Sequence, residues 1–355
     1  MAVSEIGLLG RFRGCQVGAL LGDCLGAPFE GEAPATRSVL NNYFKRLRDP
    51  DLKVPYKAYT DDYAMTKCIA QSLLDCKKFD DKDIAKKFVK EFFAEPDRGY
   101  GGNVVDVFAQ LRASKFSDVY APAALQFNGS GSYGNGGAMR ISPIALFCYN
   151  DGNDEVIDMA RKSALLTHAN RLGYNGAIMQ CLAVHTVLHT DPGQLDSAAF
   201  VKDLIVRMKK AEKPTEDDIL DKGENPYYYA SRLEKVLELL ERGDSVSQEN
   251  VEEELGVHIS AHMSVPTALY AFMRALKPIK NIEGINTYLL STYYNMLAPT
   301  ESEIRHKMAG NMAGEKLKSV VIVEMEQRHG EWLEESLCNQ QKQLQKRGKP
   351  SNSQS

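Results

Sequence analysis

The chain has 355 residues, 43% of them hydrophobic and 25% charged, with a formal net charge of −4 at pH 7, which is ordinary for a globular protein. The small negative charge argues against a surface that binds nucleic acid, and no apolar run reaches the roughly 18 residues that span a membrane. Residues 1–14 lack the apolar core of a signal peptide, and the seven cysteines are dispersed without a CxxC pair, so we expect an intracellular protein with free thiols.

Apolar residues recur at helical i, i+3 and i+4 spacing along most of the chain. The runs with this spacing cover residues 12–26, 64–76, 83–93, 103–113, 174–189, 198–211, 230–242 and 265–277. Alternating strand patterns are nearly absent, and only the β-branched run at 320–325 is ambiguous. With no internal repeat and no flexible linker, the pattern predicts an all-α, single-domain multi-helix bundle over residues 8–340 and a polar, disordered tail at 341–355.

The segment GDCLGAPFE at residues 22–30 ends the first apolar run. Its glycines and Pro28 predict that the helix stops here and that Glu30 lies on a loop. This pattern is typical of an ordinary helix end, but it also presents a carboxylate that a site could use. The residues around Glu30 leave both interpretations open.

Thr60, Asp61 and Asp62 stand directly before the second apolar run. A threonine or aspartate at this place is an ordinary helix N-cap, and only one is needed. Neighbouring residues on a helix point about 100° apart, so Asp61 and Asp62 could also flank one small cation. Carboxylate and hydroxyl oxygens suit Mg²⁺ or Ca²⁺ better than zinc. The segment therefore predicts a helix start and is a candidate site for a hard divalent cation.

The segment QFNGSGSYGNGGAMR at residues 126–140 contains five glycines. So many glycines indicate that backbone approaches another group closely, and backbone N–H groups ahead of a helix favour a phosphate. The segment is not a Walker loop, because no GKS or GKT follows, and no strand precedes it as in a Rossmann turn. A flexible surface loop is the alternative, but Phe127 and Tyr133 argue against it because they could bracket an aromatic base.

Histidines give weaker signals. His168, in LTHANRLGYNGA at residues 166–177, is a candidate for a site, although a lone histidine is more often structural. The pairs His185/His189 and His258/His262 have i, i+4 spacing but lack an HExxH frame, so we do not predict zinc there. No GxSxG motif is present, and no cysteine has the setting of a nucleophile.

Six segments taken together resemble the ADP-ribosylglycohydrolase family over nearly the whole chain, and most closely its ADP-ribosylhydrolase 3 branch, which acts on ADP-ribosylserine and poly(ADP-ribose). These segments are residues 18–30, 59–65, 97–105, 126–140, 166–177 and 264–272. The resemblance implies an all-α fold with a cleft that binds two Mg²⁺ ions. It also implies cleavage of the glycosidic bond at the anomeric carbon of an ADP-ribose.

The resemblance also assigns the acidic residues. It implies that Thr60, Asp61 and Asp62 are ligands of the two Mg²⁺ ions and that Asp61 faces the substrate as well. Glu30 matches a loop glutamate that shields the cleft and touches a metal ion when the site is empty. Glu30, Asp61 and Asp62 are therefore the expected catalytic residues.

The substrate contacts follow from the same resemblance. The loop that wraps the diphosphate corresponds to Ser130, Gly131, Ser132, Tyr133, Gly134, Asn135 and Gly136. Phe127 and Tyr133 match aromatic contacts to the nucleotide. His168 matches a substrate-contacting histidine, and Ile259 matches an apolar contact near the adenosine.

The chain departs from the family near its C-terminal end. The family's second acidic motif, G-G-D-T-D-T, is replaced here by Pro299-Thr300-Glu301-Ser302-Glu303-Ile304. Glu301 and Glu303 keep the charge on a longer side chain and are the expected ligands, but Ile304 offers no oxygen. Mg²⁺ requires near-ideal bonds of about 2.0–2.1 Å, so we expect a weakened second metal site. Exposed first-turn acids of a helix are the alternative interpretation of Glu301 and Glu303.

Two functions remain open at this point. The first is a Mg²⁺-dependent hydrolase that removes ADP-ribose from serine on modified proteins, with poly(ADP-ribose) as a further substrate. The second is a catalytically impaired ADP-ribose-binding paralogue on the same scaffold. Arginine-linked ADP-ribose is a less favoured substrate. The resemblance implies ADP-ribosylated proteins and poly(ADP-ribose) as partners, no membrane or direct nucleic-acid contact, a monomer, and a location in the nucleus, cytoplasm or mitochondrial matrix.

Overall fold

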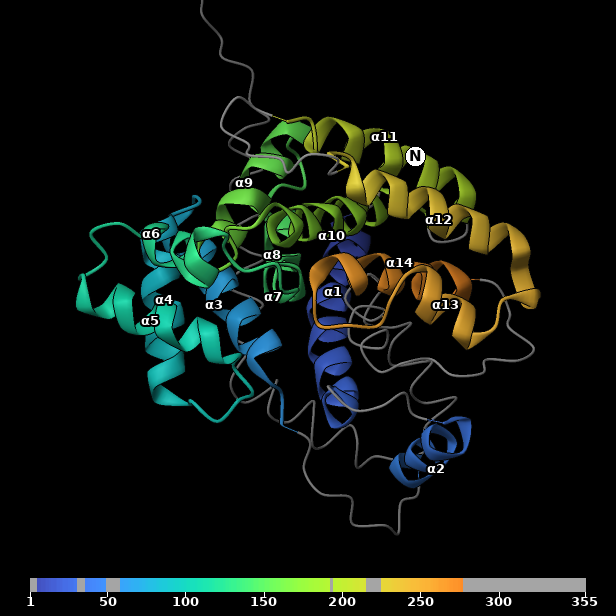
Figure 1. The fold of residues 1–355 in the computed structure, drawn as a ribbon, viewed down its shortest axis with the longest axis horizontal. Coiled ribbons are helices and arrows are strands. Elements are labelled where there is room, and N and C mark those ends of the chain that lie inside the picture. Colours follow the sequence, from blue (N-terminus) through green and yellow to red (C-terminus); the bar gives the residue numbers. More distant parts are fainter. Residues whose placement is uncertain (1–4, 31–35, 49–57, 192–193, 215–224, 277–355) are drawn as a thin grey trace, which may run out of the picture.

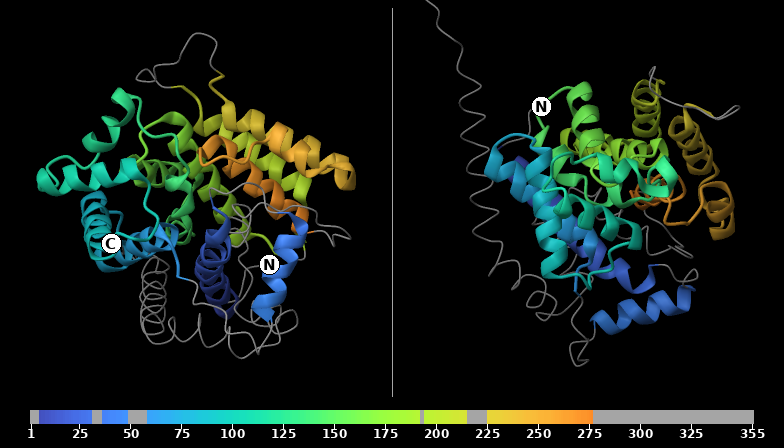
Figure 2. Two further views of the ribbon diagram at one scale, coloured as in Figure 1. Left: turned by 60° about the horizontal axis from the view of Figure 1, so that its bottom comes forward. Right: turned by 60° about the vertical axis from the view of Figure 1, so that its left-hand side comes forward.

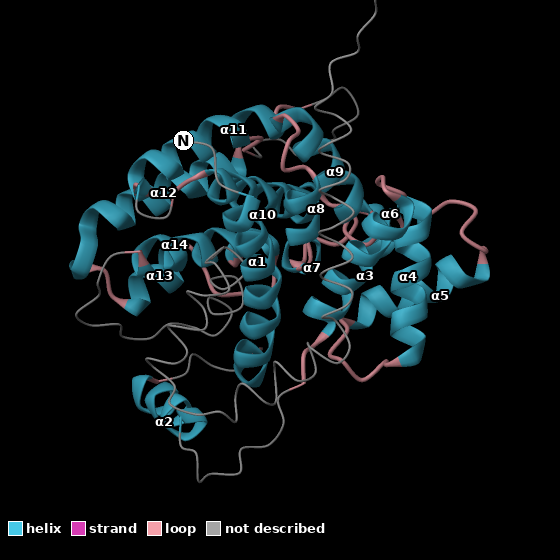
Figure 3. Ribbon diagram, turned by 180° about the vertical axis from the view of Figure 1, so that it is seen from behind, coloured by secondary structure: helices cyan, strands magenta, loops and turns pink. Residues whose placement is uncertain are grey.

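A computed structural model describes residues 5–30, 36–48, 58–191, 194–214 and 225–276. In these ranges the chain forms helices and loops and no strand, so the predicted all-α fold is confirmed (Figure 3). The α-helices are α1 (Glu5–Gly26), α2 (Arg37–Arg48), α3 (Asp61–Cys76), α4 (Asp81–Ala94), α5 (Gly102–Ala113), α6 (Ala121–Ala124), α7 (Gly136–Met139), α8 (Ser142–Phe147), α9 (Asn153–Leu165), α10 (Arg171–His189), α11 (Ser197–Ala211), α12 (Tyr228–Arg242), α13 (Gln248–Glu254) and α14 (Val265–Ala275). Short 3₁₀ turns are η1 (Ala27–Phe29), η2 (Gln126–Gly129), η4 (Gly243–Ser245) and η5 (Ala261–Met263).

Helix α10 runs through the centre of the molecule (Figure 1). Every residue from 175 to 185 is buried, because α10 packs against α1, α7, α8, α9, α11, α12 and α14. A helix that is largely apolar, with few polar residues in its buried stretch, is expected in such a central position. Figures 1 and 2 agree that α3 to α6 lie on one side of α10 and that α11 to α14 lie on the other.

The side formed by α3, α4 and α5 is held by aromatic packing. The ring centroid of Phe92 lies 5.1 Å from that of Tyr100 and 5.5 Å from that of Phe108. Phe88 and Phe108 are 6.4 Å apart. Phe88, Phe92 and Phe108 belong to the same hydrophobic core as Met65 and Ile69 of α3 and the buried residues of α10, so α3 packs into the centre of the molecule.

None of the described helices is long and apolar enough to cross a membrane. The six cysteines in the described ranges form no disulfide bond with one another. Burial raises the pKa of Cys15 and Cys68 to about 12, so these two thiols are poor nucleophiles. Residues 299–304 with Glu301 and Glu303, the run at 320–325, the predicted domain end at 340 and the tail at 341–355 lie outside the described residues.

Candidate active site

Helix α3 begins at Asp61 and is capped by the side chain of Thr60. Thr60 Oγ1 accepts a hydrogen bond from the Asp62 N–H at 3.4 Å and donates one to Asp23 Oδ1 at 2.7 Å. Asp23 Oδ2 accepts two more, from the N–H groups of Thr60 at 2.8 Å and Tyr63 at 3.1 Å. The cap is therefore made by Thr60 together with a carboxylate from α1, and both aspartates that follow are left for another role.

Asp23→Ala is expected to lower the free energy of unfolding by about 2–3 kcal/mol, because three donors at the start of α3 lose a buried charged acceptor. Urea denaturation of the wild type and the variant measures the difference. The control Thr60→Val removes only the side-chain bonds and should cost less. Equal stabilities of wild type and Asp23→Ala would contradict this role.

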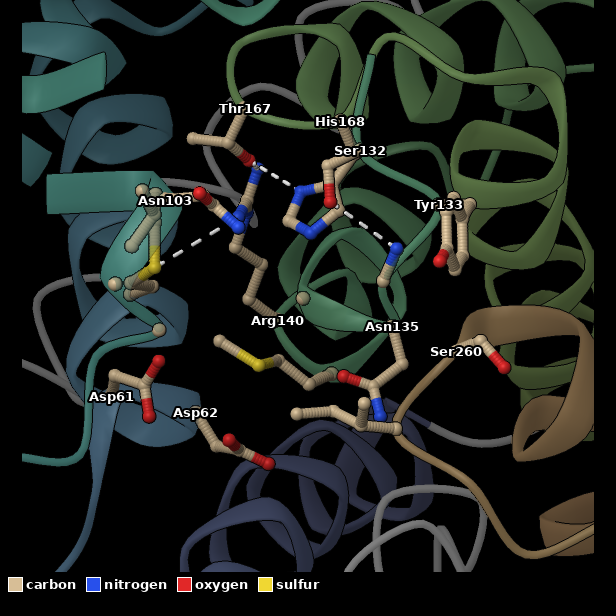
Figure 4. Close-up of a pocket in the computed structure, with 18 of the residues that line it drawn as sticks. Asp61, Asp62, Asn103, Ser132, Tyr133, Asn135, Arg140, Thr167, His168 and Ser260 are labelled. Atoms are coloured by element: carbon tan, nitrogen blue, oxygen red, sulfur yellow. Dashed lines mark hydrogen bonds between the residues drawn. The ribbon is translucent and has the colours of Figure 1, made fainter. Parts of the chain in front are cut away.

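Asp61 and Asp62 lie on one side of a cavity of about 260 Å³ (Figure 4). Glu30 also lines this cavity, close enough for its charge to act on Asp61, and we call these three residues the acidic wall. Burial raises the pKa of Asp61 to about 7, and the negative charges of Glu30 and Asp23 add to this increase. Burial also raises the pKa of Asp62 well above its ordinary value, followed by repulsion from Asp23 and Asp61. The pKa of Glu30 is raised mainly by burial. Such mutual destabilisation of carboxylates is a feature of functional sites, and a cation would relieve it.

The glycine-rich loop forms the opposite wall. The Asn135 N–H donates to the Ile259 carbonyl at 3.1 Å, and the Ala261 N–H donates to the Tyr133 carbonyl at 2.9 Å. These bonds join the loop to the segment before η5. Gly131 has a φ of +70°, and a Cβ there would lie 2.6 Å from the Asn170 nitrogen, so only glycine fits.

Aromatic and apolar side chains surround the mouth of the cavity. Phe127 and Tyr133 are 45% and 44% exposed, with ring centroids 6.1 Å apart, and Ile259 is 59% exposed. Phe127 has a φ of 51°, a conformation that a bulky residue adopts only when its surroundings impose it. Exposed rings held in this way form a surface on which a flat base could stack.

Arg140 is the only lysine or arginine among the described residues that line the cavity. Its side chain is fully buried, and its guanidinium lies 4.9 Å from the ring centroid of Phe88. Burial lowers the pKa of Arg140 to about 9, and the charge of Asp61 acts in the opposite direction. Arg140 is therefore charged at pH 7 and partly balances the acidic wall.

The structure brings most of the predicted site residues to this one cavity. Those that line it are Glu30, Asp61, Asp62, Phe127, Ser132, Tyr133, Gly134, Asn135, Gly136, His168 and Ile259. Thr60, Ser130 and Gly131 do not line it. Thr60 instead caps α3, and Ser130 donates to the Phe127 carbonyl at 2.9 Å. The chemical roles of all these residues remain predictions.

Sequence reasoning missed several residues of the site. The cavity is also lined by Met65, Gly99, Gly101, Gly102, Asn103, Val104, Gln126, Met139, Arg140, Thr167, His258 and Ser260. Asp23 is absent from the cavity wall but holds the start of α3. An aspartate between the apolar residues Leu21 and Cys24 was a signal of a buried partner. Arg140 and Thr167 lie in the segments 126–140 and 166–177 that the sequence singled out, but neither residue was distinguished there as part of a site.

The donor atoms of the acidic wall fit Mg²⁺ in their chemistry, because carboxylate oxygens are its usual protein ligands. Within the described ranges, however, no three His, Cys, Asp or Glu side chains come close enough together to hold a metal ion on their own. The further expected ligands Glu301 and Glu303 belong to the part of the chain that is not described. The described residues therefore supply at most part of the expected coordination.

Comparisons with known proteins identify relatives of this chain. A sequence model of the family ADP-ribosylglycohydrolase matches residues 4–289. The chain is 42% identical over 337 residues to the protein named ADP-ribosylhydrolase ARH3 of Mus musculus, covering 92% of this chain and 89% of that protein. It is also 42% identical over 315 residues to the Homo sapiens protein of the same name, covering 86% and 85%. A solved "ADP-ribosylglycohydrolase-related protein complex" aligns with a TM-score of 0.51 at 22% identity, covering 82% of this chain and 87% of that one, which supports the all-α fold.

Proposed function

The chain belongs to the ADP-ribosylglycohydrolase family, and from this premise we propose a Mg²⁺-dependent hydrolase that cleaves the bond between ADP-ribose and serine on modified proteins. Poly(ADP-ribose) is a further proposed substrate. One observation carries the proposal: a single cavity joins the acidic wall of Glu30, Asp61 and Asp62 to the glycine-rich loop and its aromatic mouth. We also propose that the protein is a monomer and that it is located in the nucleus, cytoplasm or mitochondrial matrix, as the resemblance of the sequence implies.

In this proposal different residues of the cavity contact the base, the diphosphate and the sugar. Phe127 and Tyr133 offer flat faces to the base, and Arg140 supplies positive charge in a wall that must accept a diphosphate. Ionised Asp61 and Asp62 place negative charge beside a sugar that becomes cationic as its glycosidic bond breaks. Glu30, Asp61 and Asp62 would supply part of the coordination of Mg²⁺, which when bound supplies Lewis-acid polarisation and a more acidic water.

Stabilisation by Mg²⁺ is expected to increase between about pH 5 and about pH 8. The pKa of Asp61 is raised from 3.8 to about 7 in the folded chain, so the folded state favours the protonated acid. The stability that this proton contributes is fully present below about pH 4 and is lost as the pH rises through about 7. Mg²⁺ binds the ionised carboxylate, so it restores stability mainly where the proton has been lost.

Thermal unfolding with and without Mg²⁺ across this pH range measures the effect. The double variant Asp61→Asn, Asp62→Asn should lose both the Mg²⁺ response and its pH dependence. A Mg²⁺-induced shift that is the same at low and high pH in the wild type would show that these carboxylates are not involved.

A second candidate function is ADP-ribose binding without turnover. The observation that favours it is the segment 299–304, where Glu301, Glu303 and Ile304 replace the family's acidic motif. The match to the family model ends at residue 289, before this segment. On this alternative the nucleotide-binding part of the cavity is retained and the second metal site is lost.

The deciding experiment has two parts. Isothermal titration with ADP-ribose, with and without Mg²⁺, tests binding, and incubation with a serine-ADP-ribosylated histone peptide tests release. Release above that of the Asp61→Ala, Asp62→Ala double variant supports the hydrolase, whereas binding without release supports the second candidate. Release from an arginine-linked peptide but not from the serine-linked one would contradict the proposed linkage, and failure to bind ADP-ribose would contradict both candidates.

A further inference from the structure

Arg140, Thr167 and His168 form a chain of hydrogen bonds in the wall of the cavity (Figure 4). Arg140 Nη2 donates to Thr167 Oγ1 at 2.7 Å and to the Ser163 carbonyl at 3.1 Å. Thr167 Oγ1 lies 2.7 Å from His168 Nδ1. Arg140 is 0% exposed, Thr167 1% and His168 8%. Because these three side chains are buried, their hydrogen bonds to one another determine where the protons lie.

The position of the Thr167 hydroxyl proton follows from the donors and acceptors around it. A guanidinium can only donate, so Thr167 Oγ1 is the acceptor toward Arg140. Among the described residues, His168 Nδ1 is the only other hydrogen-bond partner of this oxygen. A buried hydroxyl proton without an acceptor would cost about 1–3 kcal/mol. The proton is therefore directed at Nδ1, which must itself be unprotonated to accept it.

The remaining proton of the ring is then on Nε2. Burial, with the nearby charge of Arg140, lowers the pKa of His168 to about 3, so the imidazole is neutral at pH 7 and carries one proton. The positive charge of Arg140 on the Thr167 side also favours a lone pair at Nδ1 and strengthens the hydroxyl as a donor. Both considerations select the same tautomer.

The Nε2 edge of His168 lies against the glycine-rich loop. A Cβ at Gly136 would come within 2.6 Å of Cε1 and 3.0 Å of Nε2, and one at Gly134 within 3.3 Å of Nε2. His168, Gly134 and Gly136 all line the cavity, and within the described ranges no residue hydrogen-bonds to Nε2. The N–H is thus left for a group that enters the cavity.

We propose that Arg140 and Thr167 are positioning residues that hold His168 with its proton on Nε2, so that it donates a hydrogen bond to an oxygen of the bound ligand. The inference rests on the proposed function for the identity of that ligand, an ADP-ribose whose phosphates and hydroxyls offer oxygen acceptors. A fixed donor favours a ligand that presents an oxygen acceptor at this point and disfavours one that presents a cation or a donor. The specificity arises from residues that do not themselves have to touch the ligand.

The tautomer can be measured in the free protein. Long-range ¹H–¹⁵N spectra of protein labelled with ¹⁵N-histidine distinguish protonated from unprotonated ring nitrogens, and the signal missing in His168→Gln assigns this ring. We expect a protonated Nε2 and an unprotonated Nδ1 in the wild type and in Thr167→Ser, which keeps the hydroxyl. Thr167→Val, of nearly the same shape, should populate the other tautomer. A protonated Nδ1 in the wild type would overturn the inference.

Calorimetry with ADP-ribose tests the donated bond. His168→Gln can place an amide N–H near the Nε2 position and should keep affinity within about tenfold, whereas the shorter His168→Asn cannot reach and should lose about 10–100-fold. Thr167→Val should lose about tenfold, with Thr167→Ser close to wild type. Equal affinities for the Gln and Asn variants would overturn the donor role, and this pair decides the matter even where Thr167→Val does not fold. A wild type that binds no ADP-ribose contradicts the proposed function and the ligand part of the inference, while the tautomer spectra still decide the positioning part.

Discussion

Asp62→Asn is expected to lower the rate of ADP-ribose release by about 100-fold or more, and at the same time to make the metal-free protein more stable. The two effects have one cause. Asp62 is a buried carboxyl group whose pKa is raised by burial and by the charges of Asp23, Asp61 and Glu30. Asparagine has nearly the same shape and carries no charge, so the repulsion is relieved while an anionic oxygen for Mg²⁺ is lost.

The two readouts separate a functional carboxylate from a structural one. In the absence of Mg²⁺, the midpoint of thermal unfolding of Asp62→Asn should rise by about 2 °C or more, as is common when a strained site is removed. The control Asp106→Asn makes the same chemical change on an exposed position of α5 and should alter neither rate nor stability. A variant that is less stable than the wild type and still active would show that Asp62 serves the fold alone.

The helices could be predicted from the sequence because their signal is local. The spacing of apolar residues over 64–76 and 174–189 reports directly on α3 and α10. The cap at Thr60 was also a local pattern, since threonine followed by acids is typical of a helix start. The local pattern around Thr60 could not show that Asp23 completes the cap, because its carboxylate reaches the start of α3 from another helix, α1.

The candidate site also depends on contacts between distant segments, which local sequence patterns do not predict. Six segments indicated the right region through their resemblance to a family, but spacing alone placed none of them near another. The bond between Asn135 and Ile259, which brings two cavity-lining segments together, connects loops that share no sequence signal. Arg140 and Thr167 were not predicted because a buried arginine is recognised only by the carbonyl and hydroxyl groups that the fold gathers around it.

Gly136→Ala is expected to distort the opposite wall of the same cavity and so to lower both stability and activity. The new Cβ would lie 2.6 Å from Cε1 of His168, a distance that no relaxed structure accepts. The ring has little freedom to move, because its Nδ1 is bound to Thr167 at 2.7 Å, and Thr167 is in turn bound to Arg140. We expect a loss of about 1–3 kcal/mol in the free energy of unfolding, as for other overpacked sites. A displacement of about 1 Å in the wall should lower the rate of ADP-ribose release by about 100-fold.

Gly102→Ala provides the matched comparison, because it adds the same methyl group to another glycine of the same cavity. Nothing lies within 4 Å of a Cβ at Gly102, which is the first residue of α5. Alanine suits a helix better than glycine there, so stability should stay constant or rise by about 0.4–1 kcal/mol. Urea denaturation and peptide release, measured on both variants, test the pair. If Gly136→Ala matched Gly102→Ala in stability and rate, His168 would have to be mobile, and the fixed wall on which the proposed chemistry depends would not exist.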